Sequence, residues 1–305
     1  MEYTVKKFKV FSSDKIHKLN AVAYIPNGEI KGIFHLVHGM TEYIDRYAPL
    51  MAEIAECGFV CCGYDNLGHG KTAKDDNELG FIAEKGGYKL LIDDVKIFAD
   101  FMKNEYHTDT YILMGHSMGS FIARLAAVKY NRDFSRLIIC GTAGPNPLAA
   151  AGLFLSRFIA LFKGKKGHSS FLENLVFGAY NKRFSGSTKY EWLTNDRQIV
   201  DNYVMDKYCT FRFTLSAMHD LIKLNSLCNK SAWFKKMPKD LPIFIIAGED
   251  DPVGNYGEGV KVVYEKLKAA GKQNVTLKLY KGCRHEIHND NCKKEMAEDI
   301  ISFIN

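Results

Sequence analysis

Gly115-His116-Ser117-Met118-Gly119 is the stretch that decides the fold of this chain, and it directly follows an apolar run at residues 111–114. A G-x-S-x-G pentapeptide between a strand and a helix is typical of a nucleophile elbow, in which a serine occupies a sharp turn. Side chains beside such a turn would collide, so glycines two residues away are expected. The apolar positions of residues 121–128 have the spacing of a helix. The alternative is a serine in an ordinary glycine-rich turn, and the rest of the chain favours the nucleophile.

Short apolar runs and longer helical patterns alternate on both sides of this turn. The runs predict buried strands at residues 33–37, 59–64, 137–140, 243–247 and 275–280, and the patterns predict helices at 47–56, 88–105, 259–270 and 294–304. Two further strands, 4–11 and 15–24, are expected to form a hairpin before them. Because most of these strands are apolar throughout rather than at alternate positions, they predict an α/β fold with a mostly parallel central sheet flanked by helices.

The alternation stops near Gly144 and resumes near residue 239. The intervening segment contains no convincing strand and several helical patterns, such as residues 212–223. We therefore expect residues 1–144 and 236–305 to form the core, and residues 145–235 to form a helical cap, or lid, inserted between two strands.

The composition is that of an ordinary globular protein, with 47% hydrophobic and 25% charged residues among 305. The net charge of +6 is mild and no basic stripe with interleaved aromatic residues is present, so nucleic acid is not an expected partner. The first residues lack the apolar centre of a signal peptide, and the apolar stretch at 148–162 is too short to span a bilayer.

The eight cysteines are scattered and form neither a dense disulfide framework nor paired metal-binding motifs. Several lie in apolar segments and are interpreted as small buried hydrophobic residues. We expect a cytoplasmic protein that binds no metal.

A serine nucleophile needs a base, usually a histidine that is oriented by a carboxylate. In a parallel sheet these groups should follow the carboxyl ends of strands. The predicted strand at 243–247 leads to Asp250 and Asp251, and the strand at 275–280 leads to His285, with His288 three residues further on. The order serine, aspartate, histidine is that of an α/β-hydrolase.

Five motifs in this order resemble the α/β-hydrolases of the monoacylglycerol lipase and lysophospholipase group, also described as serine aminopeptidase (S33-type) hydrolases. The resemblance covers the chain from about Gly32 to its end, and its motifs lie at residues 38–47, 65–70, 115–119, 248–253 and 282–286, with weaker similarity at 192–196 and 203–206. The chain departs from this family at three positions: the family often has a second glycine at Thr41, a histidine at Tyr43 and a basic residue at Leu67.

The resemblance implies roles for individual residues. The family pattern G-x-x-D selects Asp251 over Asp250, and G-x-x-H selects His285 over His288. The catalytic residues are then Ser117, Asp251 and His285. The resemblance also implies that the backbone N–H groups of Met40 and Met118 form the oxyanion hole, and that no cofactor is needed.

Two neighbouring side chains are expected to act as supports. Glu42 should cap or brace the helix that follows it, and His116 should pack against or support the elbow.

The segment 148–162 is more apolar than a solvent-facing helix requires. One interpretation is that Phe154, Phe158 and Phe162 bind the acyl chain of a lipid or touch a membrane surface, and another is that they pack on the core. The basic run at 163–166 could meet anionic lipid headgroups or form a solvated loop.

The sequence therefore predicts a serine hydrolase of carboxylic esters, with a monoacylglycerol or lysophospholipid as the leading substrate class. An acyltransferase or small-peptide hydrolase using the same three residues is the alternative among enzymes. A catalytically silent ligand-binding protein on this fold is the alternative outside enzymes. The oligomeric state is not indicated.

Overall fold

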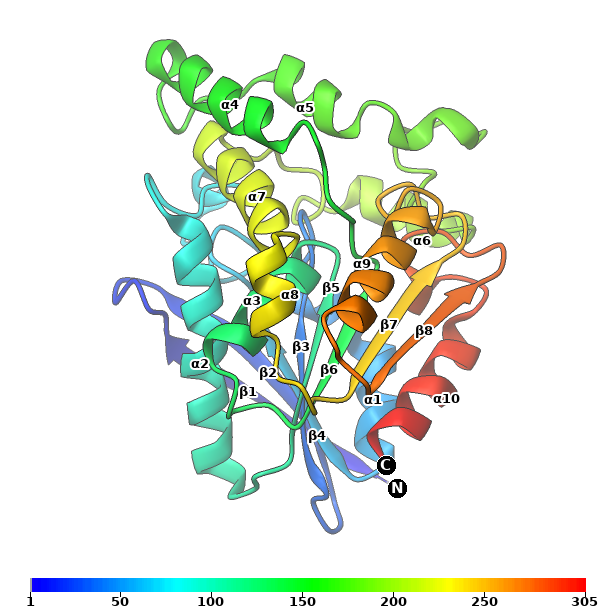
Figure 1. The fold of residues 1–305 in the computed structure, drawn as a ribbon. Coiled ribbons are helices and arrows are strands. Elements are labelled where there is room, and N and C mark those ends of the chain that lie inside the picture. The colour runs from blue at the N-terminus through cyan, green and yellow to red at the C-terminus, as the bar shows by residue number, and fades with distance from the viewer. Residues whose placement is uncertain (1) are drawn as a thin grey trace.

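The computed structural model describes residues 2–305, which fold around one eight-stranded sheet (Figure 1). The order of the strands is β1-β2-β4-β3-β5-β6-β7-β8. Their bounds are β1 Tyr3–Phe11, β2 Lys18–Pro26, β3 Gly32–Val37, β4 Phe59–Tyr64, β5 Tyr111–His116, β6 Arg136–Cys140, β7 Ile243–Gly248 and β8 Val275–Tyr280. Strand β2 pairs antiparallel with both β1 and β4, and the other neighbouring pairs are parallel. The mostly parallel sheet predicted from the sequence is confirmed.

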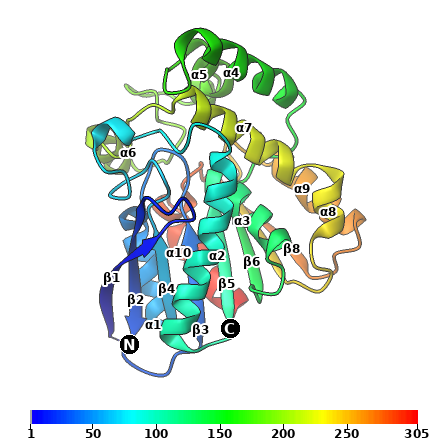
Figure 2. The same cartoon turned by 90° about the vertical axis from the view of Figure 1, so that its left-hand side faces the viewer.

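Helices cover both faces of the sheet (Figures 1 and 2). On one face lie α1 (Ala48–Glu56) and α10 (Lys293–Ile304), and on the other lie α2 (Gly87–Tyr106), α3 (Met118–Lys129) and α9 (Glu258–Ala269). Successive side chains of a strand point to opposite faces. In β5, Leu113 belongs to the core beneath α2 and α3, whereas Ile112 and Met114 belong to the core beneath α1 and α10.

The segment between β6 and β7 contains helices and no strand. Its helices are α4 (Ala149–Lys163), α5 (Ser170–Phe177), the 3-10 turn Tyr180–Arg183, α6 (Arg197–Met205), α7 (Leu215–Cys228) and α8 (Ser231–Lys236). Helices α4 and α5 lie beyond the edge at which the parallel strands end, and α7 runs from there toward α3 (Figures 1 and 2).

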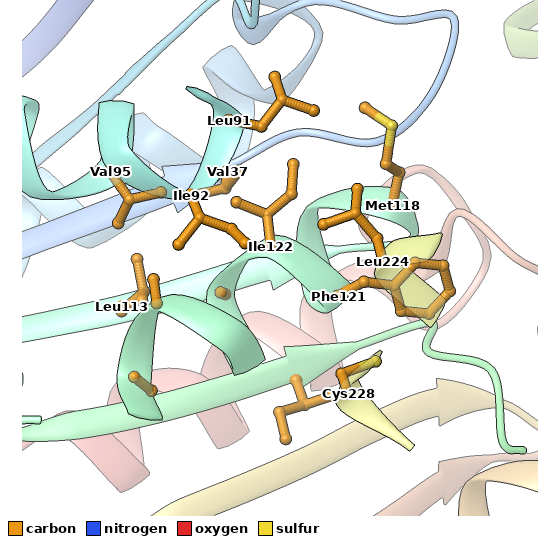
Figure 3. Packing of buried hydrophobic residues seen from close by; sticks show 14 of the residues in the cluster. Val37, Leu91, Ile92, Val95, Leu113, Met118, Phe121, Ile122, Leu224 and Cys228 are labelled. Atoms are coloured by element: carbon orange, nitrogen blue, oxygen red, sulfur yellow. The ribbon is translucent and has the colours of Figure 1, made fainter. Parts of the chain in front are cut away.

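Helix α7 is anchored in the main core. Leu224 and Cys228 of α7 pack with Phe121 of α3 in the cluster that also holds Leu113 of β5 (Figure 3). The buried guanidinium of Arg124 on α3 donates to the carbonyl oxygen of Cys228 at 2.6 Å, at the negative end of the α7 dipole. The second half of the 145–235 segment is therefore tied to the sheet, while α4 and α5 form an outer layer.

Two predicted elements begin later in the structure than in the sequence analysis. The strand expected from residue 15 begins at Lys18, because the Asp14 carboxylate accepts the N–H groups of Ile16 and His17 and lengthens the turn. The helix expected from residue 212 begins at Leu215, because the side chain of Thr214 caps it. In the part of the chain that the structure describes, no helix is both long and apolar enough to cross a membrane.

Candidate active site

Ser117 lies at a sharp turn between β5 and α3. Its φ of 53° and ψ of −121° are a strained conformation for a residue other than glycine. The flanking glycines make this turn sterically feasible. A Cβ on Gly119 would lie 2.0 Å from the carbonyl oxygen of Val37, and one on Gly115 would lie 2.2 Å from that of Gly119. The turn therefore packs directly on the end of β3, and only glycine fits two positions before and two positions after the serine.

The predicted carboxylate and base lie together after the last two strands. Asp251 follows β7 and His285 follows β8, and the Nδ1–H of His285 donates to Oδ2 of Asp251 at 2.9 Å. Both side chains are almost fully buried, and Asp251 also accepts the N–H of Val253 at 2.8 Å. Because a carboxylate only accepts hydrogen bonds, this contact fixes the proton on Nδ1 and leaves Nε2 as the basic nitrogen.

Asp250 and His288, the alternatives for the carboxylate and the base, have different surroundings. Asp250 is exposed to solvent, whereas Asp251 is buried against His285. His288 is buried and stacks on Tyr47, with ring centroids 4.2 Å apart. Burial lowers the pKa of His288 to about 3. The geometry therefore favours Asp251 and His285 as the predicted pair.

Ser117 and His285 line the same cavity, which has a volume of about 920 Å³. Within residues 2–305, Ser117 Oγ forms no hydrogen bond with His285. Such contacts often form only when substrate is in place. The structure thus pairs His285 with Asp251 and brings Ser117 to the same cavity.

The loop after β3 passes directly beside the elbow. A Cβ on Gly39 would lie 2.9 Å from Cβ of Ser117. Met40 follows this glycine, and both Met40 and Met118 line the cavity that contains Ser117. This is where the resemblance expects two backbone N–H groups to face a substrate carbonyl.

A buried ion pair lies behind the elbow and connects this loop with the histidine loop. Oε1 of Glu42 accepts the N–H of Gly39, the hydroxyl of Tyr47 at 2.8 Å and Nδ1–H of His116 at 3.1 Å. On its other side, Nε2–H of His116 donates to the carbonyl oxygen of His285 at 3.2 Å. Glu42 thus braces Gly39 and His116, and through Tyr47 and Arg46 it also braces the 3-10 turn Ile44–Tyr47 that follows it, as the sequence analysis expected.

Electrostatics favour the charged forms of Glu42 and His116, which make up this buried ion pair. Burial opposes both charges, but the hydrogen bond and opposite charge of the partner outweigh it. The pKa of Glu42 therefore lies well below its ordinary value, and the pKa of His116 lies above its own. A protonated His116 donates from both ring nitrogens, which suits its two acceptors.

Arg46 extends this network to the residue next to His285. Its guanidinium donates two hydrogen bonds of 2.7 Å to the carboxylate of Glu286 and a third of 3.2 Å to Glu42. Paired planar groups of this kind fix orientation as well as charge. The sequence analysis included these two residues only within the motif ranges 38–47 and 282–286 and did not predict their contact.

Comparison with known proteins identifies the family of the chain. Residues 28–292 match the model of the family described as "Serine aminopeptidase, S33". The chain belongs to that family. The α/β-hydrolase resemblance predicted from the five motifs is confirmed.

Several relatives of this S33-family chain are lipases and esterases. A monoacylglycerol lipase of Mycolicibacterium smegmatis is 22% identical over 290 residues, covering 92% of this chain and 90% of that protein. A monoglyceride lipase of Homo sapiens is 23% identical over 283 residues, covering 92% and 83%. The structure of a thermostable carboxyl esterase from Bacillus coagulans, in complex with glycerol, has a TM-score of 0.90 and 34% identity over 100% of this chain and 98% of that one.

The 145–235 segment of the S33-family chain supplies part of the wall around His285. The ring of Trp192 lies 5.1 Å from the ring of His285 and lines the same cavity. The main-chain oxygens of Trp192 and Leu193 accept the N–H groups of His285 and Glu286 at 3.4 and 2.7 Å. The sequence analysis noted 192–196 only as a family-like stretch, and no local pattern indicated that it contacts the histidine loop.

The expected acyl-chain contacts of three phenylalanines are wrong. Phe154, Phe158 and Phe162 do not line the cavity, and their side chains are 70%, 49% and 76% exposed. Helix α4 turns Ala149 and Gly152 toward the cavity instead. Residues four apart share one helix face, so the three phenylalanines form a stripe on the outer face, which also rules out packing on the core.

The interpretation of several cysteines as small buried residues is confirmed at five free positions, and the structure adds one disulfide. Cys283 and Cys292 form a disulfide that closes the loop carrying His285, whereas the other six cysteines are free thiols. Sequence spacing alone did not distinguish this pair from the buried free cysteines.

Proposed function

We propose that this chain is a serine hydrolase that cleaves carboxylic esters through an acyl-enzyme. The lipase and carboxyl esterase relatives support a carboxylic-ester hydrolase. The single observation that carries the mechanism is the strained Ser117 elbow, which faces the same cavity as a histidine already paired with a buried aspartate. This combination matches what a serine hydroxyl needs for nucleophilic attack.

In the proposed reaction, Ser117 Oγ attacks the ester carbonyl carbon while Nε2 of His285 takes its proton. The oxyanion accepts hydrogen bonds from the N–H groups of Met40 and Met118. The bond to the alcohol then breaks, and His285 returns the proton to the departing alkoxide. Water attacks the resulting acyl-enzyme with His285 again as base, which releases the carboxylic acid and restores Ser117. Asp251 holds His285 in the required tautomer throughout.

The cavity favours an ester with a long acyl chain. Its apolar wall comes from several helices and loops, with Phe121, Leu148, Leu172, Phe211, Phe213 and Leu221 among its residues. Polar side chains such as Asn181, Lys189 and Tyr190 line another part. A large apolar space with a few polar groups fits an acyl chain with a small polar alcohol. We propose a monoacylglycerol or a lysophospholipid as the substrate class.

The segment 145–235 acts in this proposal as the cap that encloses the cavity. The outer stripe of α4 is a contact for a lipid surface, because three phenylalanines are exposed there together with Leu161 at 80%. Lys163, Lys165 and Lys166 follow directly and would attract anionic headgroups. Contact with a lipid surface would be transient, and we propose the cytoplasm as the location.

The test of the catalytic proposal is covalent labelling by a fluorophosphonate, combined with a substrate panel. We expect the wild type to be labelled and Ser117→Ala, with the same fold, not to be labelled. In the panel, glycerol monoesters or lysophospholipids should be hydrolysed faster than peptide substrates. An unlabelled, folded wild type would favour a silent binding protein. Faster acyl transfer to an added alcohol than to water would favour an acyltransferase.

A further inference from the structure

Thr41 occupies an unusual backbone conformation in the loop that contains Met40. Its φ is 51°, in the left-handed region that favours glycine, and threonine is β-branched. A glycine would adopt this conformation without strain. A threonine remains there only where surrounding contacts hold it.

Those contacts come from the 145–235 segment. The hydroxyl of Tyr203 on α6 donates to the carbonyl oxygen of Thr41 at 2.9 Å, and it lies 2.8 Å from Oγ1 of Thr41. A tyrosine hydroxyl has one hydrogen, which the carbonyl oxygen takes, so Oγ1 of Thr41 donates the second hydrogen bond. The hydroxyl of Tyr203 therefore forms hydrogen bonds with both the backbone and the side chain of Thr41.

Tyr203 is itself firmly held. It is 4% exposed, the guanidinium of Arg46 lies 4.9 Å from its ring centroid, and the ring of Tyr190 lies 5.0 Å away. Because Arg46 is bound to Glu286, the ring is fixed from the side of the histidine loop as well. Its hydroxyl thus has a defined position relative to Thr41.

We propose that Tyr203 is a positioning residue for catalysis, which acts through Thr41 to hold the N–H of Met40 toward the substrate oxyanion. This inference rests on the proposed function, since it assigns a role in the same oxyanion hole. With this role for Tyr203, the 145–235 segment helps to position the catalytic groups and also forms a wall of the cavity. The side chain of Thr41 provides the second hydrogen bond.

The test is Tyr203→Phe, which removes the hydroxyl and keeps the ring between Arg46 and Tyr190. We expect kcat on a soluble short-chain ester to fall about tenfold, as expected for one lost hydrogen bond that acts in the transition state. The KM should change less than twofold, and the rate of fluorophosphonate labelling should fall by a similar factor to kcat. Tyr208→Phe, on the loop after α6, is the matched control and should leave both rates unchanged.

Thr41 gives a second, independent measurement. Thr41→Ser keeps both hydrogen bonds with Tyr203 and should retain most activity. Thr41→Val loses the hydrogen bond from Oγ1 and should have a lower kcat. Adding Tyr203→Phe to Thr41→Val should reduce kcat less than it does in the wild type, because the two residues form one contact. These comparisons hold even if Tyr203→Phe melts at a lower temperature.

The outcomes separate this inference from the proposed function. Normal kcat and labelling in both Tyr203→Phe and Thr41→Val would overturn the positioning role while leaving the nucleophile intact. A rise in KM with unchanged kcat would mean that Tyr203 binds the alcohol, which also overturns it. Absence of Ser117-dependent labelling in the wild type would overturn the proposed function, and this inference with it.

Discussion

Glu42 illustrates how single residues organise this site. It is 2% exposed, and its carboxylate receives hydrogen bonds from Gly39, Tyr47, His116 and Arg46. A buried charge is tolerated only when it is paired and hydrogen-bonded in this way. The carboxylate links the loop before Met40 to the histidine that supports the backbone of His285.

Glu42→Gln should therefore destabilise the protein and slow its labelling. Removing one partner of a buried ion pair leaves His116 and Arg46 without part of their compensation, which costs about 3 kcal/mol. Urea unfolding measures this loss, and the rate of fluorophosphonate labelling measures the displacement of Gly39 and His285. Glu56→Gln, at the exposed end of α1, should change stability by less than about 0.5 kcal/mol. A Glu42→Gln protein as stable as the wild type would show that desolvation of the pair cancels its attraction.

At the scale of elements, α4 has two faces with different surroundings. Its buried residues are Ala149, Gly152 and Ser156, and the Ser156 hydroxyl lies 3.0 Å from Nδ1 of His219 on α7. The opposite face carries the exposed phenylalanine stripe, in which the rings of Phe158 and Phe162 lie 5.3 Å apart. Nothing in the described residues covers this stripe, and it is the lipid contact that we propose.

Phe158→Ser with Phe162→Ser should weaken vesicle binding without harming the fold. We expect at least a tenfold loss of affinity for anionic phospholipid vesicles, because two aromatic side chains no longer enter the lipid. Turnover of a long-chain ester in those vesicles should fall with it, while that of a soluble short-chain ester stays the same. Phe11→Ser with Ile16→Ser, which removes exposed apolar groups of the β1–β2 hairpin, is the matched control. Equal losses on both esters would contradict a surface role.

Across the whole molecule, the sequence predicted features that depend on neighbouring residues and missed contacts between residues that are far apart in the chain. The buried strands, the elbow and the order of Ser117, Asp251 and His285 follow from local periodicity and short motifs, which a linear chain displays directly. The contact between Arg46 and Glu286 spans 240 positions, and that between Thr41 and Tyr203 spans 162. No periodicity selects such partners among 41 basic and 35 acidic residues.

The outward direction of Phe158 also depends on contacts between distant parts of the chain. An apolar run predicts that some surface is covered, but which face of α4 is covered depends on where α7 packs. Helix α7 is in turn held by its packing on α3 and by the contact of Arg124 with its end. The sequence therefore predicted the type of each element better than the direction of its faces.

Two buried carboxyl groups tie the outer parts of the fold to α2. Asp94 accepts the N–H of Ser13 at 2.6 Å and the hydroxyl of Ser12 at 3.0 Å, which joins α2 to the β1–β2 turn. Asp220 of α7 lies against Gly87 at the start of the same helix. Burial raises the pKa of each carboxyl to about 6, so the folded protein holds these protons more tightly than the unfolded chain does.

The stability that Asp94 and Asp220 contribute should therefore fall as pH rises from about 4 to about 6. Below the ordinary pKa of 3.8 both states hold the proton of Asp94, and its stabilising effect is fully present; it is lost as pH rises to about 6. Asp94→Asn mimics the protonated form, so its stability relative to the wild type should increase by about 3 kcal/mol between pH 3.5 and 7. Urea unfolding at several pH values measures this difference. Asp100→Asn, on the same helix with a carboxylate bound to Lys96, is the control. A pH-independent difference between Asp94→Asn and the wild type would show that folding does not change the pKa of Asp94.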